Sequence, residues 1–306
     1  MKKIYLILIL AGTLLLDACE PKTKKDEDSY LQPISDRYLG QKPPGLTPIA
    51  FAPGIVSTEE YFEDGNTFSP DLKEYYFVRH GGKYEKPTSM VIRYENGNWG
   101  DEVETDIKYP VFSKDGNTIY RGNKYKVRTD SGWSEFKSMG SPFTDKIIMG
   151  ITVSNSGTFF FDEFVFDEFE RPDTVGAISY SRRVNGEYQP RQKLGEEINT
   201  GAWIAHPYIA PDESYLLWNV KREDGYGDSD IYVSFQENNG SWTLAINMGD
   251  KINTTHGESG PKVTPDEKYL FFWRGYERVE EDGSSFWVGS PYWVDAKVIE
   301  NLRPKQ

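Results

Sequence analysis

Residues 240–272, GSWTLAINMGDKINTTHGESGPKVTPDEKYLFF, decide the fold. The stretch begins with a turn glycine and an aromatic residue two positions later, and it continues through a Met-Gly and an Ile-Asn-Thr. It ends in two short apolar runs, 261–264 and 268–272, on either side of a tight Pro-Asp-Glu turn. Strand, polar turn and strand in this order predict a β-hairpin.

Earlier copies of this pattern lie upstream. One period before, a turn glycine, an aromatic residue and an Ile-Asn-Thr precede a second Pro-Asp-Glu turn at 211–213. The aromatic residue and the next glycine are seven positions apart in three copies: Trp133 and Gly140, Tyr188 and Gly195, and Trp242 and Gly249. A chance cluster of apolar residues would not keep this offset, so the chain contains an internal repeat.

A polar turn marks each copy of the repeat. It occurs five times, at 69–71, 113–115, 154–156, 210–212 and 264–266, and its third residues are 44, 41, 56 and 54 positions apart. Strand-rich repeats of about 40–50 residues indicate a β-propeller with four-stranded blades. We therefore predict an all-β propeller of five blades, with six as the alternative if residues 30–56 hold further structure. Asp212 and Asp266 should close their turns by accepting backbone N–H bonds.

The repeat also predicts where the strands of each blade lie. The inner strand precedes the polar turn and the second strand follows it. Third strands are expected at 90–94, 125–128, 177–181, 230–234 and 292–294, and outer strands near Trp99, Trp133, Tyr188 and Trp242. The fifth copy lacks a Gly-x-Trp outer strand. The apolar stretch 49–56 could supply that strand and close the ring, which removes exposed edges; the alternative is residues 297–302.

These elements resemble the TolB-type, WD-repeat-like β-propeller family. The similarity comes from the Ser-Pro-Asp turn, the Asp-Ile-Tyr-Val-Ser strand at 230–234 and the Gly-x-Trp element, and it covers roughly residues 57–303. It is most specific in the last two copies, because Ser156 replaces the turn aspartate in the third. The ending Tyr-Trp-Val-Asp-Ala-Lys at 292–297 also looks like the close of such propellers in bacterial surface lipoproteins. The resemblance implies a propeller and allows a role within an envelope complex.

The first residues resemble a lipoprotein signal. Met-Lys-Lys precedes thirteen mostly apolar residues, a run too short to span a bilayer. Residues 16–19, Leu-Asp-Ala-Cys, resemble the lipobox, in which the cysteine is acylated after cleavage. Cys19 is the only cysteine of the chain, which excludes an internal disulfide. We expect residues 1–18 to be a signal peptide, 19–44 a flexible tether and 45–306 a single propeller domain.

The segment after Cys19 and the net charge indicate an envelope location. Lys25 followed by three acidic residues resembles the export signal of surface lipoproteins in some Gram-negative bacteria. We therefore expect an outer-membrane lipoprotein, on the periplasmic or the cell-surface face. The chain has 35 basic and 48 acidic residues and a net charge of −13. This balance argues against a nucleic-acid partner and against adsorption to anionic lipid, so membrane contact would come from the lipid anchor.

Propeller topology gathers the residues before the inner strands and after the second strands on one face, around the central channel. Propellers bind ligands there because several blades contribute side chains to one rim. The ligand-binding candidates on this face are Arg79, His80, Arg121, His206, Trp218, His256, Trp273 and Arg274. Arginines at the rim suit an anionic or hydroxyl-rich ligand. The alternative is that the arginines neutralise neighbouring carboxylates.

Asp162, Glu163 and Glu258 are the candidate catalytic carboxylates. Asp162 and Glu163 lie in an aromatic and acidic stretch, 160–170, where a carboxyl pKa could rise. Neighbours on a strand should point to opposite sides, so an acid/base partner such as Glu258 must come from another blade. The alternative is an extended hairpin, aromatic on one side and acidic on the other. Residues 224–230 offer oxygen atoms, but their spacing is not that of a calcium loop, and we expect no metal or cofactor.

Three functions remain open on the sequence. The first is a membrane-anchored module that binds a glycan or a peptide at the channel face without catalysis, since no nucleophile motif, phosphate loop or zinc signature occurs. The second is a polysaccharide hydrolase or lyase that uses carboxylates or histidines of the same face. The third is a scaffold in an envelope complex, which would present a broad flat patch in place of a pocket.

We predict that Cys19 carries the lipid. Changing Cys19→Ala should release the protein from membranes, because several acyl chains together hold a protein firmly and the variant would carry none. The measurement is the distribution between membrane and soluble fractions after a high-salt wash. Retention of the variant in the washed membrane would rule out the anchor.

Overall fold

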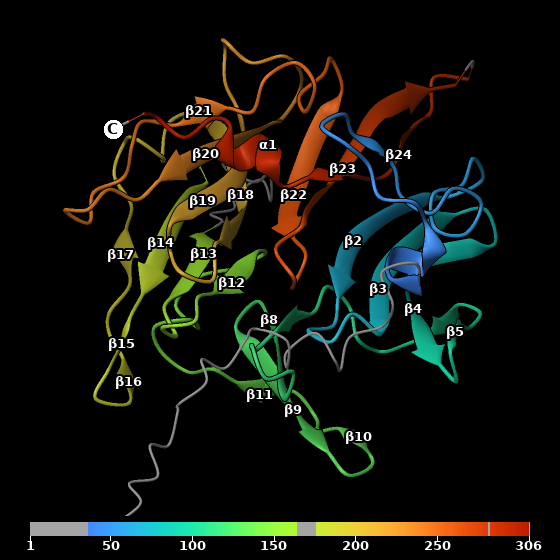
Figure 1. Cartoon of the computed structure of the whole chain (residues 1–306), viewed down its shortest axis with the longest axis horizontal. Helices are drawn as coiled ribbons and strands as arrows, with labels where there is room; N and C mark the ends of the chain where they lie inside the picture. Colours follow the sequence, from blue (N-terminus) through green and yellow to red (C-terminus); the bar gives the residue numbers. More distant parts are fainter. Residues whose placement is uncertain (1–35, 164–175, 281, 306) are drawn as a thin grey trace, which may run out of the picture. The chain divides into compact units, whose positions relative to one another are not determined.

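The computed structural model describes residues 36–163, 176–280 and 282–305 (Figure 1). The expected signal peptide, Cys19 and the expected tether up to residue 35 lie outside the described residues, as does the part of the aromatic and acidic stretch after residue 163. The described residues all belong to one compact unit. Within them, no helix is long and apolar enough to cross a membrane.

The described chain forms five antiparallel sheets of four or five strands, which are the blades of a propeller, and one further two-stranded sheet. Four strands of each sheet make up the blade. Blade 1 contains β2 (Phe62–Phe68), β3 (Glu74–Gly81), β4 (Tyr84–Glu95) and β6 (Val103–Glu104). Blade 2 contains β7 (Val111–Phe112), β8 (Thr118–Arg121), β9 (Lys124–Thr129) and β11 (Lys137–Ser138). Blade 3 contains β12 (Ile151–Val153), β13 (Phe159–Glu163), β14 (Ala177–Ser181) and β17 (Gln192–Lys193). Blade 4 contains β18 (Ala202–Ile209), β19 (Tyr215–Lys221), β20 (Asp230–Phe235) and β21 (Ile246–Asn247). Blade 5 contains β22 (Gly257–Val263), β23 (Tyr269–Val279), β24 (Ser285–Asp295) and β1 (Ile49–Ala50).

This arrangement confirms the predicted five-blade propeller. The middle strands are rich in β-branched and aromatic residues, which favour pleated, buried surfaces. All six residues of β20 are buried, so the strand is covered on both faces. Its polar residues Asp230 and Ser234 are held by hydrogen bonds from Asn247 and to the Thr243 carbonyl, respectively. Blades 4 and 5 share one apolar cluster that includes Leu217, Val233, Leu270 and Val294.

The repeated aromatic residue precedes the outer strand and does not belong to it. Trp99, Trp133 and Tyr188 lie in the two-residue strands β5 (Asn98–Trp99), β10 (Gly132–Trp133) and β16 (Glu187–Tyr188), of which β16 pairs with β15 (Arg183–Val184). In blades 1 to 4 the outer strand begins four positions after the aromatic residue. The ring itself packs on an aromatic residue of an inner or second strand, as Trp99 does on Phe68 at 6.5 Å between ring centroids.

The ring closes through β1, as the first of the two closure hypotheses predicted. Ile49 and Ala50 pair with Trp293 and Tyr292 of β24 and complete blade 5. The alternative is wrong, because residues 297–300 form the short helix α1 (Lys297–Glu300). Figure 1 shows β1 beside β24, so the first and the last described strands share one sheet.

A cluster of aromatic rings fills the closure. Phe51 is fully buried, and its ring lies 5.9 Å from that of Phe68, 4.8 Å from that of Phe271 and 5.2 Å from that of Trp293. Tyr38 is also buried in this cluster, from the turn η3 (Tyr38–Gly40). The packed region therefore extends into residues 36–44, which the sequence had placed in the tether.

The polar turns are closed by their own side chains. The Asp212 carboxylate accepts the backbone N–H two residues on, at 3.0 Å, which confirms the expectation for this turn. The expectation is wrong for Asp266. Its carboxylate accepts the hydroxyls of Thr264 (2.8 Å) and Tyr38 (2.6 Å), so this aspartate ties the start of the described chain to blade 5.

The repeated Ile-Asn-Thr has a structural explanation. Asn253 accepts the backbone N–H of Ile231 and donates to its carbonyl, at 2.8 and 2.9 Å. Asn199 makes the same pair of bonds with Ile178, at 2.7 and 3.0 Å. In both blades, an asparagine side chain thus satisfies the backbone N–H and carbonyl of the second residue of the third strand. Such bonds matter because a buried backbone group without a hydrogen-bond partner is costly in free energy.

We predict that Phe51 is the main single contributor to closure. Phe51→Ala should lower the free energy of unfolding by about 3–5 kcal/mol, because the cavity left by a buried phenylalanine cannot fully collapse. Ile55→Ala is the matched control, since Ile55 is half exposed in the same segment. Denaturant unfolding measures both. A loss below about 1 kcal/mol for Phe51→Ala would show that closure depends on other contacts.

Candidate functional site

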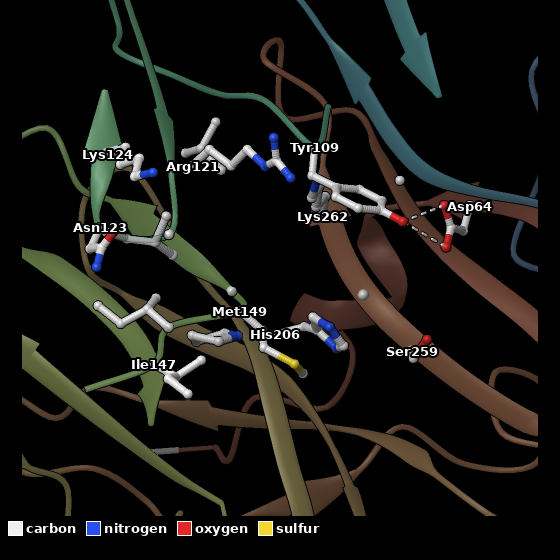
Figure 2. Close-up of a pocket in the computed structure, with 18 of the residues that line it drawn as sticks. Asp64, Tyr109, Arg121, Asn123, Lys124, Ile147, Met149, His206, Ser259 and Lys262 are labelled. Carbon is white, nitrogen blue, oxygen red and sulfur yellow. Dashed lines mark hydrogen bonds between the residues drawn. The ribbon is translucent and has the colours of Figure 1, made fainter. Parts of the chain in front are cut away.

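Five residues occupy the same position in the five blades. Each lies six residues before the third residue of its polar turn, and together they are Gly65, Tyr109, Gly150, His206 and Gly260. All five line one cavity of ≈ 1010 Å³ (Figure 2). Every blade therefore contributes one residue at the same level of the channel, and we call these five residues the bulge ring.

The backbone leaves regular strand pairing at the bulge ring. The register of β2, β18 and β22 with its partner strand shifts at this position, which is the mark of a β-bulge. The backbone angle φ is 74° at Gly65, 50° at Tyr109, 51° at His206 and 59° at Gly260. Residues with a side chain rarely adopt such angles, so glycine at these positions needs no functional explanation.

Tyr109 and His206 are the two members of the bulge ring that carry side chains. Holding a residue other than glycine in this conformation costs about 1–3 kcal/mol, and such strain gathers at functional sites. Both residues line the cavity, as Figure 2 shows. Tyr109 and His206 therefore carry a conformational strain energy that glycine at the same position avoids. This strain makes the two residues candidates for a functional role.

The hydrogen bonds of His206 fix its tautomer. Its Nδ1 lies 2.8 Å from Asn219 Oδ1, which also accepts the backbone N–H of Gly260 at 3.3 Å. Because that backbone group is always a donor, the atom on Asn219 is an oxygen, and His206 Nδ1–H donates to it. In the neutral imidazole the lone pair then lies on Nε2. His206 can therefore accept a hydrogen bond from a ligand hydroxyl.

Tyr109 is part of a polar cluster that spans blades 1 and 2. Its hydroxyl donates to the Asp64 carboxylate, at 3.1 Å from each oxygen, and His80 Nε2 lies 3.5 Å from the same carboxylate. Burial and the Asp64 charge raise the pKa of Tyr109 above its ordinary value, while Arg121 acts in the opposite direction. Tyr109 therefore stays a neutral phenol, able to donate or accept a hydrogen bond.

Lys262 reaches the cavity from β22. Its ammonium donates to Thr67 Oγ1 at 2.7 Å, across the boundary between blades 5 and 1. Burial lowers the pKa of Lys262 to about 8, against the opposing effect of Asp64. Arg121 reaches the same cavity from the end of β8 (Figure 2). The cavity is thus lined by cationic groups, although the chain as a whole is acidic.

An aromatic mouth adjoins the cavity. A pocket of ≈ 640 Å³ shares Phe62, His206 and Trp273 with it, and the pocket is also lined by Trp203 and Trp287. Trp203 is 39% exposed and Trp287 is 46% exposed. Polar side chains alternate with these rings around the pocket: Asn219, Lys221, Asp228, Ser229, Ser259 and Glu277. We call the four rings of Phe62, Trp203, Trp273 and Trp287 the aromatic mouth.

A strand bulge and two glycines determine how the rings of Trp203 and Trp273 are oriented. Trp203 has φ 55° and lies in the bulged part of β18. The Trp273 indole lies against Gly275 and Gly289, where an added β-carbon would come within 2.1 and 2.4 Å of the ring. Both glycines are therefore needed for the indole to lie flat on the hairpin. Trp273 Nε1 is buried without a hydrogen-bond partner among the described residues, so it remains a donor for water or ligand.

Two of the predicted rim arginines are structural. Arg274 Nε donates to Glu258 at 2.8 Å, and the same carboxylate accepts the backbone N–H and the hydroxyl of Thr254. Burial raises the pKa of Glu258, and the bonds from Thr254 and Arg274 oppose this. The arrangement ties the loop before the inner strand to the second strand. Glu258 is fully buried, so neither it nor Arg274 reaches the cavity lining.

Blade 1 repeats this arrangement with a variation. Glu63, also fully buried, accepts the hydroxyl of Thr58 at 2.6 Å, and Arg79 lies opposite Glu63 in the strand register. Arg79 pairs with Glu102 at 2.8 Å and donates to the Ile55 carbonyl. Burial raises the pKa of Glu63 to about 7 despite these donors. The interpretation that arginines neutralise nearby carboxylates therefore describes Arg79 and Arg274.

Asp162 has a positioning role. Its carboxylate is fully buried and accepts backbone N–H bonds from Met149 (2.8 Å), Gly150 (2.9 Å) and His206 (3.0 Å). Burial raises its pKa, and His206 together with these donors opposes the rise. Asp162 thus holds two members of the bulge ring in place. Glu163 points elsewhere and lies 3.2 Å from Arg191, as the alternation along a strand predicts.

Two further candidates lie outside the cavity. Trp218 is 0% exposed and packs in the apolar cluster with Phe160 and Tyr232. The expectation that Trp218 faces the channel is wrong. Side chains alternate along β19, and the next residue, Asn219, is the one that faces the channel. His256 stacks on Tyr276 at 4.8 Å and lines neither the cavity nor the mouth.

The structure brings together a site that the sequence predicted only in part. Arg121, His206 and Trp273 line the cavity, and His80 touches it through Asp64. Sequence reasoning missed Asp64, Tyr109, Lys262, Trp203 and Trp287. Counting six residues back from each turn would have found Tyr109, where three copies have glycine. No group of three metal-ligating side chains occurs among the described residues.

Comparison with known proteins identifies no family for the chain. No family model matches the chain, and no curated protein matches it. A gluconolactonase from Xanthomonas campestris is similar at 11% identity and a TM-score of 0.42, over 82% of this chain and 95% of that one. An alpha-L-arabinofuranosidase from Podospora anserina is similar at 11% identity and a TM-score of 0.49, over 82% and 97%.

A further solved structure is similar over a smaller share of its length. Hydrazine synthase from Kuenenia stuttgartiensis matches at 15% identity and a TM-score of 0.38; the match covers 73% of this chain and 58% of that one. At these values the similarities carry no information about activity. The propeller rests on the strand pairing described above, and membership of the TolB-type family stays a proposal.

We predict that glycine at position 206 does not destabilise the protein. His206→Gly should keep the free energy of unfolding within about 1 kcal/mol of the wild type, because relief of the left-handed strain offsets the lost contacts. Gly65→Ala is the reverse change and should cost about 1–3 kcal/mol, since its β-carbon would come within 2.6 Å of the Tyr109 ring. Thermal and denaturant unfolding measure both. A loss above about 2 kcal/mol in His206→Gly would mean that His206 is retained for stability.

Proposed function

We propose that the protein is a membrane-anchored binding propeller that takes a saccharide at the aromatic mouth. One observation carries the proposal: Trp203 and Trp287 present their rings to solvent beside polar side chains that line the same pocket. Exposed aromatic rings of this kind stack on the apolar faces of sugar rings, while nearby polar groups bond the hydroxyls. The anchor at Cys19 and the location at the outer membrane belong to this proposal and rest on the sequence motifs.

The state of the carboxylates supports binding over hydrolysis. A glycoside hydrolase needs two carboxyl groups about 5–10 Å apart that face the same bond. Asp162 is engaged in backbone bonds that include one from blade 4, and Glu258 is engaged in bonds that tie the loop before β22 to β23. In the cavity, Asp64 is engaged with Tyr109, and Asp145 lies 3.7 Å from Arg191. The pocket also argues against a scaffold whose contact surface is flat.

The test is a glycan panel applied to the purified full chain in detergent. Trp203→Ala and Trp287→Ala should each weaken binding of a positive glycan by about 1–2 kcal/mol, the range for a contact residue with a large apolar ring. Leu244→Ala is the matched control, because Leu244 is 78% exposed and lines neither the mouth nor the cavity. Calorimetry measures the affinities.

Two outcomes would change the conclusion. If no glycan binds, or if both tryptophan variants bind like the wild type, the mouth is not a saccharide site. If the bound glycan is cleaved, and cleavage is lost in Asp64→Asn, the protein is an enzyme whose active site is this cavity. Product analysis by mass spectrometry separates binding from cleavage.

A further inference from the structure

The cations of the cavity have no acidic partners. Arg121, Lys124 and Lys262 line the cavity, and none of them forms an ion pair with a carboxylate of the described residues. Lys262 donates to the neutral hydroxyl of Thr67. Arg121 and Lys124 are exposed and Lys262 is partly exposed, so these positive charges are open to an anionic ligand.

Asp64, Tyr109, Arg121 and Lys262 line the cavity from three blades and act on one another electrostatically. We call these four residues the charged end of the cavity. Burial and Asp64 of blade 1 raise the pKa of Tyr109, and Arg121 of blade 2 opposes the rise. Burial lowers the pKa of Lys262 in blade 5, and Asp64 opposes the fall. Figure 2 shows Arg121 extending toward Tyr109 and Lys262, with Asp64 beyond the Tyr109 hydroxyl. Over the whole cavity lining, the four cations Arg121, Lys124, Lys146 and Lys262 outnumber the two carboxylates Asp64 and Asp145. The cavity is therefore net positive and suits an anionic group.

The charged end and the aromatic mouth are parts of one continuous site. Phe62, His206 and Trp273 line both. A ligand whose sugar ring lies on the mouth can therefore extend an acidic group toward Arg121 and Lys262. His206 lies where the two parts meet, and its Nε2 lone pair suits a sugar hydroxyl.

We propose that Arg121 and Lys262, beside the Tyr109 hydroxyl, form a carboxylate subsite, and that the ligand is an acidic saccharide containing hexuronic acid residues. This inference rests on the proposed function, because the mouth must hold the sugar ring. Arginine offers a planar pair of N–H donors that matches a carboxylate, and lysine adds a point charge. The Tyr109 hydroxyl, which donates to Asp64, lines the same cavity beside these cations.

The experiment compares matched ligands on the full-length protein in detergent. The probes are hexuronic acid oligosaccharides, the same oligosaccharides with their carboxyl groups reduced to primary alcohols, and the reduced oligosaccharides carrying O-sulfate. The acidic form should bind at least tenfold more tightly than the reduced form. Isothermal titration calorimetry at pH 7 measures the affinities, below the pKa of Lys262.

The variants Arg121→Gln and Lys262→Met test the subsite. Each should weaken binding of the acidic oligosaccharide about tenfold to hundredfold, as for a lost charged hydrogen bond, and leave binding of the reduced form unchanged. Lys137→Met is the matched control, since Lys137 is exposed on the outer strand of the same blade as Arg121 and changes the net charge equally. Unfolding curves confirm that each variant is folded.

The outcomes separate the two proposals. If the reduced form binds as tightly as the acidic form, the carboxylate subsite is wrong and saccharide binding stands. If the sulfated form binds most tightly, the cations select sulfate and the uronic acid assignment is wrong. If Lys137→Met weakens binding as much as Lys262→Met, the effect is one of net charge. If no form of the oligosaccharide binds, both proposals fail.

Discussion

Two residues from the start of the described chain complete a sheet that is otherwise made by its end. Ile49 and Ala50 pair with β24, and Phe51 follows them into a cluster with rings from blades 1 and 5. Closure matters because an open propeller would expose a strand edge and leave its first and last blades with one uncovered face each. It also fixes blade 1 against blade 5, and this boundary is where Lys262 reaches Thr67. The geometry of the cavity therefore depends on contacts made at the rim of the molecule.

Convergence of the inner strands explains why the site lies at the bulge ring. Inner strands that approach one channel bend where their backbones come close, and β2, β18 and β22 each have a bulge at the same count from their turns. Gly150 shows the crowding, since an added β-carbon would meet Asp162 and the backbone of His206 at 2.8 Å. A residue placed there is fixed by the backbone on both sides, so Tyr109 and His206 hold their orientation with little freedom. The strain that makes these positions unfavourable for a side chain also makes them precise for a ligand.

The fold was more accessible from the sequence than the site, for a physical reason. Turns, strands and the closing segment are local patterns, and the five polar turns and the apolar run at 49–56 were enough to place them. Side-chain direction depends on single positions. A difference of one residue along β19 decides that Asn219, and not Trp218, faces the channel. The bulges in β18 change which side chains face the channel, so simple alternation does not predict that Trp203 lines the mouth. The mouth also needs Trp287, which lies on a hairpin longer than the repeat predicts.

The repeat itself separates structural charges from those open to a ligand. Arg79 and Arg274 each lie sixteen positions after a buried glutamate, Glu63 or Glu258, and each pair is opposed in the strand register. In blade 2 the position of the glutamate is taken by Ile107, which is buried and apolar. Blade 2 therefore has no carboxylate at the position where Glu63 and Glu258 lie opposite their arginines. Arg121 lies at the end of β8, two positions before the place that corresponds to Arg79 and Arg274, and it lines the cavity. Arg121 has no buried glutamate opposite it, in contrast to Arg79 and Arg274. This difference is the physical reason for assigning the charge of Arg121 to ligand binding.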